Sequence, residues 1–162
     1  MTSAGFYQTQ LQNSLELLKW VTTNLADHLT EEPPATYTQW SVQRHIYHLW
    51  VYEHYVTAMM RSWLADAAAP SDDTIQEFNT LWANQATDWS KIPFDEILTR
   101  LTTVRQEQID LIGKYTQDDW QRKMPMVWGD VSLEWTVAKT IQHATEHTDT
   151  LMKLNLWWQT SL

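Results

Sequence analysis

Residues 41–63 read SVQRHIYHLWVYEHYVTAMMRSW, and apolar residues recur through this stretch at helical spacing. The positions of its inward face follow one another at intervals of four and three: Val42, Ile46, Leu49, Glu53, Val56, Met60 and Trp63. This spacing is typical of a helix that buries one face. Ser41 is a good N-cap residue. We therefore expect a long helix from about residue 41 to residue 68.

Four further segments show the same helical period, at about residues 6–29, 72–89, 94–112 and 132–158. Prolines separate several of them, at Pro33-Pro34, Pro70 and Pro93, because proline cannot continue a helix and restrains the residue before it. Five helical segments, four of them long, predict an all-α four-helix bundle with a short extra helix in the crossover. The expected order of the four bundle helices is up-down-down-up.

The segment from Thr116 to Val131 has no clean period and contains Pro125 and Gly129. It is predicted to be a long ordered loop, anchored by Trp120 and Trp128. No repeat or interdomain linker appears, and 162 residues fit one domain spanning residues 1–162.

The composition excludes several classes of function. Eleven Lys and Arg stand against twenty Asp and Glu, a net charge of −9 with no basic block, so nucleic acid and anionic membranes are not expected partners. Cysteine is absent, which excludes disulfides, thiolate catalysis and cysteine zinc sites. There is neither an apolar run of ~18 residues nor a secretory leader. We therefore expect no membrane span and a cytoplasmic location.

Three histidines point to a metal site. His143 and His147 are four residues apart on the last predicted helix, so their rings lie about 40° apart around its axis and can reach one ion. His48 lies next to Leu49 and faces inward from the second helix. Imidazole is a common ligand of zinc, nickel and iron, and three such ligands leave a coordination position open. Alternatively, His143 and His147 are a surface pair, or a core pair whose hydrogen bonds are satisfied within the protein.

Two other histidines of the second helix, His45 and His54, turn away from His48 by about 60° and 120°. They are expected at the surface or in support of the ligands.

Because ligand imidazoles must be neutral, metal affinity is expected to fall as the pH drops through about 6.

Residues 40–49, WSVQRHIYHL, resemble the W-S-x-x-x-x-x-x-H-L opening of the second helix in the DinB-like (YfiT-like) family. The Asp118-Asp119-Trp120 turn also resembles that family, and the likeness extends over nearly the whole chain in the number and order of helices. It implies a divalent metal held by His48, His143 and His147. Some relatives act as thiol-dependent transferases or isomerases and others as hydrolases. The resemblance and the apolar, Trp-rich C-terminal segment also favour a homodimer.

Glu53, Glu146 and Trp128 are further candidates for residues that support the metal ligands or line a pocket. Residues 143–147 read HATEH and match the H-x-x-E-H motif of zinc peptidases, in which the glutamate activates water. No glutamate follows His147 to serve as the third ligand of such a site, so a peptidase is not favoured. Glu53 stands in an apolar stripe, where a carboxylate needs a partner; pairing with Arg or Lys at the bundle edge is its alternative role.

The chain contains eleven tryptophans, which divide into two groups. Those on apolar stripes are expected to pack in the core: Trp20, Trp63, Trp82 and Trp158. Those near helix ends that flank the histidines are candidates for a cavity wall: Trp40, Trp128 and Trp135.

Together these features predict a metal-dependent hydrolase or thiol-dependent transferase that acts on a small molecule. A non-catalytic bundle that binds an apolar ligand or forms a homodimer is the alternative.

Overall fold

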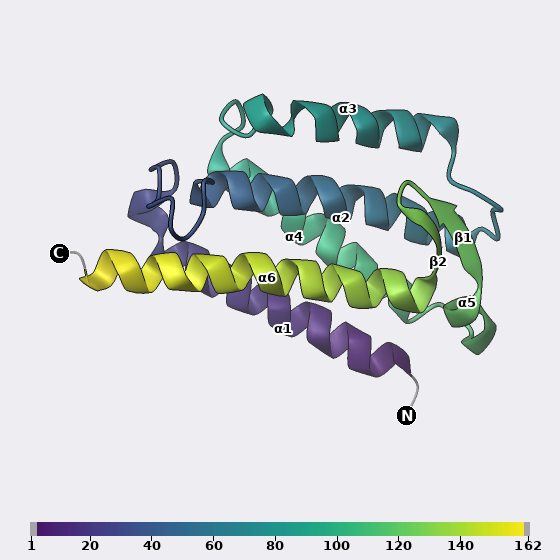
Figure 1. Cartoon of the computed structure of the whole chain (residues 1–162). Helices are drawn as coiled ribbons and strands as arrows, with labels where there is room; N and C mark the ends of the chain where they lie inside the picture. Colours follow the sequence, from purple (N-terminus) through teal and green to yellow (C-terminus); the bar gives the residue numbers. More distant parts are fainter. Residues whose placement is uncertain (1–2, 161–162) are drawn as a thin grey trace.

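The computed structural model describes residues 3–160, which form long helices packed side by side (Figure 1). Four of them make up the bundle: α1 (Ser3–Asn24), α2 (Val42–Leu64), α4 (Phe94–Ile112) and α6 (Leu133–Thr160). Helices α1 and α6 run in one direction, and α2 and α4 run in the opposite direction (Figure 1). The predicted all-α four-helix bundle is confirmed, with the up-down-down-up order that the sequence suggests.

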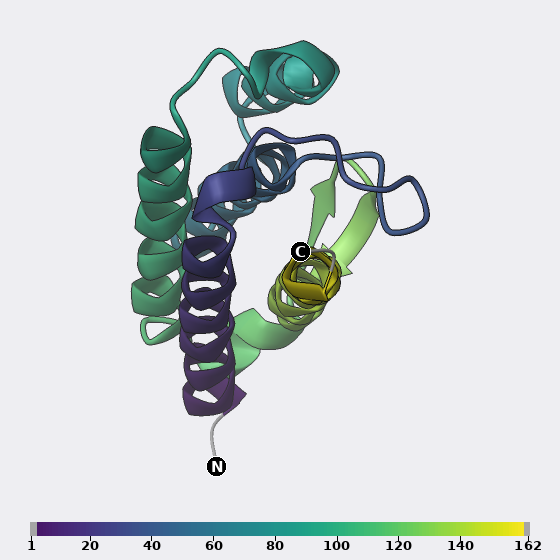
Figure 2. The ribbon, with the colours of Figure 1, turned by 90° about the vertical axis from the view of Figure 1, so that its left-hand side faces the viewer.

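Helix α3 (Asp72–Asp88) lies outside the bundle, against α2 (Figure 2). It connects the end of α2 to the start of α4, which is the crossover where the sequence predicts an extra helix. Its 17 residues agree with the predicted segment 72–89, and it is shorter than each of the four bundle helices. Its start is fixed by Ser71, whose hydroxyl accepts a hydrogen bond from the Thr74 amide at 3.2 Å.

Helix α2 is the most enclosed element of the fold. It contacts α3, α4 and α6, and most of its side chains are buried, including the polar side chains of His45, His48 and Glu53. Its predicted N-cap is present, since the Ser41 hydroxyl accepts a hydrogen bond from the Arg44 amide at 3.3 Å. Within residues 3–160, no helix combines the length and the hydropathy of a membrane-spanning segment.

The segment from Thr116 to Val131 is more regular than the predicted loop. It contains a short helix, α5 (Gln117–Gln121), and an antiparallel hairpin of β1 (Lys123–Met126) and β2 (Gly129–Ser132). A five-residue helix is too short to show a period. It is defined instead by a capping box, in which Thr116 and Asp119 each bond the other's backbone amide.

The hairpin turns on only two residues, Val127 and Trp128, and Gly129 follows with a positive φ of 113°. The pairs of an antiparallel ladder alternate between hydrogen-bonded and non-bonded, so Pro125 can occupy the pair one step from the turn without losing a bond. As predicted, Trp120 is buried and anchors this segment, stacking on Tyr7 of α1.

A buried ion pair joins α2 to α4. Arg105, which is 0% exposed, donates from Nε to Glu53 Oε2 at 2.6 Å and forms a second bond to the other carboxylate oxygen. Arg105 also donates to the Ser14 hydroxyl of α1 at 2.6 Å. Glu53 therefore does pair with an arginine, but inside the core rather than at the bundle edge.

Substitution Arg105→Met is expected to lower the free energy of unfolding by about 3–5 kcal/mol, because it leaves the Glu53 carboxylate buried without a counter-charge. The double variant Glu53→Leu/Arg105→Met is expected to recover most of that loss, since it removes both charges. Urea denaturation measures both effects.

Arg61→Met is the matched control for this measurement. Arg61 and Glu107 also form a bidentate pair between α2 and α4, but the arginine side chain is 55% exposed. Its loss is expected to change the free energy of unfolding by less than about 1 kcal/mol. Equal losses in Arg105→Met and Arg61→Met would contradict a structural role for the buried pair.

Candidate metal centre

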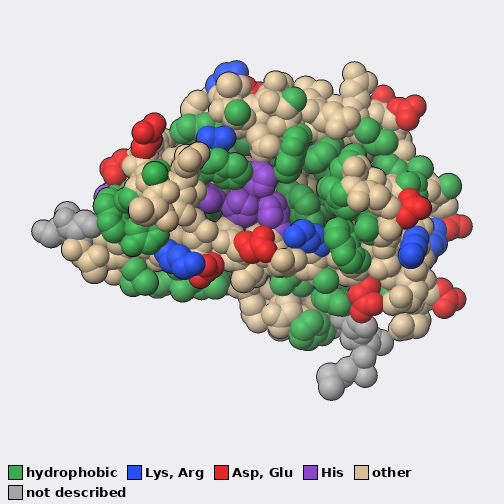
Figure 3. All heavy atoms as spheres, viewed as in Figure 1, with side chains coloured by type: hydrophobic (Ala, Val, Ile, Leu, Met, Phe, Trp, Pro, Cys, Tyr) green, Lys and Arg blue, Asp and Glu red, His purple; other side chains and the backbone are tan. Residues whose placement is uncertain are grey.

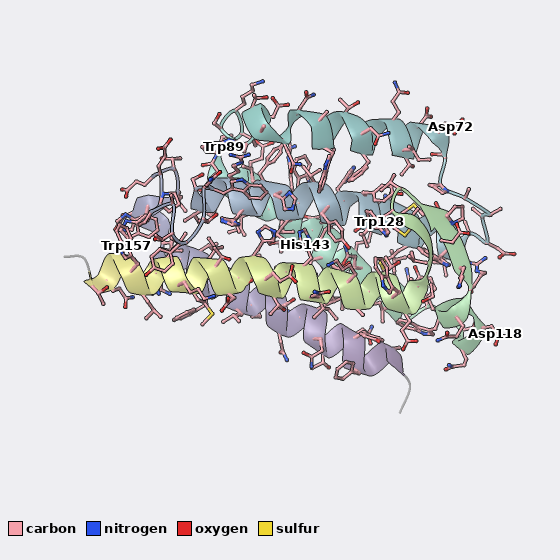
Figure 4. All side chains as sticks on the ribbon, in the orientation of Figure 1. Asp72, Trp89, Asp118, Trp128, His143 and Trp157 are labelled. Atoms are coloured by element: carbon pink, nitrogen blue, oxygen red, sulfur yellow. The ribbon has the colours of Figure 1, made fainter. Side chains whose placement is uncertain are left out.

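Three histidines meet between α2 and α6. His48 comes from α2, and His143 and His147 come from α6, where His143 points towards α2 (Figure 4). Their ring nitrogens lie close together, with 3.0 Å between Nε2 of His48 and Nε2 of His143 and 3.1 Å between Nε2 of His147 and Nε2 of His143. Figure 3 shows histidine side chains gathered at one spot in the middle of this face, beside hydrophobic side chains.

The outer nitrogens of two of these rings have protein partners. Nδ1 of His48 lies 2.6 Å from Oε1 of Gln85 on α3, and Nδ1 of His147 lies 2.7 Å from Nδ1 of His45. Because an amide oxygen only accepts, His48 carries its proton on Nδ1 and keeps a free lone pair on Nε2. If His147 likewise donates from Nδ1, His45 accepts and can donate from its own Nε2 to the Thr38 hydroxyl, 3.2 Å away.

This set of tautomers directs the Nε2 lone pairs of His48 and His147 towards His143. Two nitrogens about 2.1 Å from one ion are about 3.0 Å apart at a right angle and about 3.4 Å apart at the tetrahedral angle. The separations of 3.0 and 3.1 Å agree with two such pairs, and the ligand atoms of all three rings lie within 4.8 Å of one another. The residues present fit the divalent ion that imidazole ligands favour.

Burial keeps the imidazoles neutral. Burial, and then the neighbouring imidazoles, lower the pKa of His143 and of His147 to about 3, and burial also lowers the pKa of His48. His45 behaves in the same way, with a pKa lowered to about 3. Protons therefore compete with a metal only in more acid solution than the value of about 6 expected from the sequence.

A pocket of about 520 Å³ adjoins the cluster at His143. Its lining comes from α2, α3, α6 and the hairpin turn: Tyr52, Phe78, Asn79, Trp82, Val127, Trp128, Lys139 and His143. Trp128, at the tip of the hairpin, stacks on Tyr52 with ring centroids 5.6 Å apart (Figure 4). The hairpin thus supplies one wall of a pocket whose far end is a histidine of the cluster.

Trp40 closes another side of the cluster. Its ring contacts those of His45, His48 and His147, with centroids 4.9–5.9 Å apart. Trp135, which the sequence groups with it, is 44% exposed, and its ring contacts that of Trp128 with centroids 6.5 Å apart. Trp82 differs from the expected core residue, because it is 40% exposed and lines the pocket.

The side chains of the two acidic candidates, Glu53 and Glu146, do not bond the histidines of the metal centre in the described residues. Glu53 bonds Arg105, and no hydrogen bond within residues 3–160 joins its side chain to a histidine. Glu146 is exposed and accepts a hydrogen bond from Gln142. Trp128 is the one member of that group that lines the pocket.

Sequence reasoning missed Gln85, Thr38 and Lys139. Gln85 holds the ring of His48 from a helix, and Thr38 contacts His45, which in turn contacts His147, from a loop. No local pattern reveals the placement of either element. Lys139 carried a usable signal, since it precedes His143 by four residues and so lies on the same face of α6. His45 takes one of its two expected roles, in support of a ligand, while His54 pairs with Glu77 near the surface.

The lowered histidine pKa values predict an acid-sensitive fold. Between pH 6.5 and about 3, unfolded histidines bind protons that the folded ones do not, so the free energy of unfolding of metal-free protein falls as the pH falls. His45, His143 and His147 together give a slope of up to about 4 kcal/mol per pH unit. Urea titrations at pH 7, 6 and 5 in the presence of a chelator measure it.

The variant His147→Gln removes one of these groups and is expected to reduce the slope by roughly 1.4 kcal/mol per pH unit. His54→Gln, at the edge of the same bundle, serves as the control. An unchanged slope in His147→Gln would show that its ring is not held neutral in the folded protein.

A comparison with curated proteins finds no match, whereas a protein-family model matches most of the chain. The model of the DinB superfamily, a metal-binding family, matches residues 8–151, which include His48, His143 and His147. The chain therefore belongs to the DinB superfamily.

Proposed function

We propose that this protein is a metal-dependent enzyme that acts on a small molecule, with one divalent metal held by His48, His143 and His147. The observation that carries the proposal is the convergence of three Nε2 atoms from two helices at the end of a pocket. A metal bound there supplies Lewis acidity to a substrate or nucleophile, since three protein ligands leave coordination positions open.

The surrounding residues hold the ligand rings in place. Gln85 and His45 fix the orientation and the proton of His48 and His147, and Trp40 covers their rings. Burial keeps the imidazoles neutral at pH 7, which is the form that binds a metal. These contacts hold the ligand rings in orientations that suit a metal.

The residues that line the pocket limit which reactions are possible there. Among residues 3–160 no carboxylate lines it, and Glu146 is exposed to solvent, so the water activation of H-x-x-E-H peptidases has no general base here. The chain also lacks cysteine, and a thiol-dependent transfer therefore takes its thiol from a separate cofactor. Transfer of such a thiol, or hydrolysis by a metal-activated water, are the two reactions that this site supports.

Elemental analysis of untagged protein, purified without a nickel column, tests the metal. We expect about one zinc, nickel or iron per chain, lost in His48→Ala and in His147→Ala with the helical circular dichroism retained. His54→Ala, on the same helix as His48, is expected to keep the metal. Protein that is metal-free and fails to take up added metal would contradict the enzyme and leave the non-catalytic apolar-ligand bundle.

Gln85→Leu tests the support of the ligands separately. It removes the acceptor for His48 Nδ1 and is expected to weaken zinc binding about 10–100-fold, measured by competition with a chelator of known affinity. Gln76→Leu, on the exposed face of the same helix, is the control and is expected to bind zinc like the wild type. Equal affinity in both variants would contradict a role for α3 in the centre.

A further inference from the structure

The pocket beside the histidines gathers donors that have no partner. In residues 3–160, four buried side-chain polar atoms form no hydrogen bond, and three of them belong to residues of this pocket: Tyr52 Oη, Trp128 Nε1 and His143 Nδ1. Thr140 lies beside the Tyr52 hydroxyl, but the Thr140 hydroxyl donates its hydrogen bond to the Thr136 carbonyl. Burial raises the pKa of Tyr52, so it stays protonated at neutral pH. Buried polar groups are rarely left unpaired, and such a cluster indicates a place that a ligand completes.

The pocket is also positively charged within an acidic protein. Of the described residues that line it, Lys139 is the one lysine or arginine, and none is an aspartate or glutamate. In the part of the chain that the structure describes, Lys139 forms no ion pair, and its ammonium reaches only Gln142 Oε1, at 3.4 Å. A free cation beside a metal site, on a chain of net charge −9, attracts an anionic ligand.

Apart from Asn79, the remaining lining of the pocket is apolar and mostly aromatic. Phe78 and Trp82 of α3 contact each other with ring centroids 5.3 Å apart, and Trp128 faces them from the hairpin. A volume of about 520 Å³ accommodates a small molecule with a planar body. Aromatic walls favour such a body through burial and stacking.

We infer that the substrate is a small organic acid, with a planar apolar body between Trp82 and Trp128 and a carboxylate held by Lys139 and the Tyr52 hydroxyl. The inference rests on the proposed function, in that this acid is what the metal centre acts on. The binding preference itself follows from the pocket and does not require the metal. The two can therefore fail independently.

The test compares 2-naphthoate with 2-naphthamide, which share the planar body and differ in charge. Calorimetric titrations at pH 7.5 use the protein as purified and again after chelator treatment. Wild-type protein is expected to bind the acid about tenfold more tightly than the amide in both preparations, because a hydrogen bond to a charged group is worth more than one to a neutral group.

Three variants locate the acid group. In chelator-treated protein, Lys139→Met is expected to abolish the tenfold preference, because it weakens binding of the acid about tenfold more than binding of the amide. Tyr52→Phe keeps the ring and is expected to weaken both probes severalfold, because both present an acceptor oxygen. Lys153→Met, on the same helix but paired with Asp149 at the surface, is expected to bind like the wild type.

Equal binding of acid and amide, no binding of either, or a preference that survives Lys139→Met would each overturn the inference. A preference seen only in metal-containing protein would also overturn the role of Lys139. Metal analysis of the same samples separates these outcomes from failure of the proposed function. Acid binding without metal uptake contradicts the enzyme alone, and metal uptake without acid preference contradicts the substrate class alone.

Discussion

Helix α2 lies against α3, α4 and α6, so the polar side chains that it buries must find partners on those neighbours. Each neighbour provides one. Glu53 pairs with Arg105 of α4, His48 bonds Gln85 of α3, and His45 bonds His147 of α6. A shift of any neighbour along α2 by one turn would break its polar contact and leave a buried group unsatisfied. The packing of the bundle and the alignment of the metal ligands are therefore the same set of contacts.

The histidine centre weakens the fold that contains it. Nε2 lone pairs directed at one another within about 3 Å are unfavourable without a cation between them, and the buried imidazoles resist protonation. A ligand that binds only the folded state adds stability in proportion to its affinity. A metal at this site thus both supplies the proposed chemistry and offsets the cost of burying four imidazoles in one place.

Much of this arrangement can be read from the sequence, because helices and i, i+4 pairs are local. The helices and the pairing of His143 with His147 follow from spacing, and the caps at Ser41 and Ser71 follow from residue type. His48 joins the pair through its inward position on another helix and through the family resemblance. The hairpin does not, since strands of four residues bury only Met124 and Met126 on one side, too few to show alternation. The partners of Glu53 and His48 lie 52 and 37 residues away, and only tertiary packing brings Arg105 and Gln85 to them.

Helix α6 carries both the proposed acid-binding residue and two of the proposed metal ligands. Lys139, His143 and His147 follow one another at intervals of four, so they form a row along one face of α6. Each step of four residues advances about 6 Å along the helix. If Lys139 holds the acid group of the substrate, the metal ligands begin one turn away, and the reacting bond lies within about 6 Å of the carboxylate. Only a compact acid, whose reactive bond is a few atoms from its carboxylate, places that bond at the metal while its planar part contacts Trp82 and Trp128.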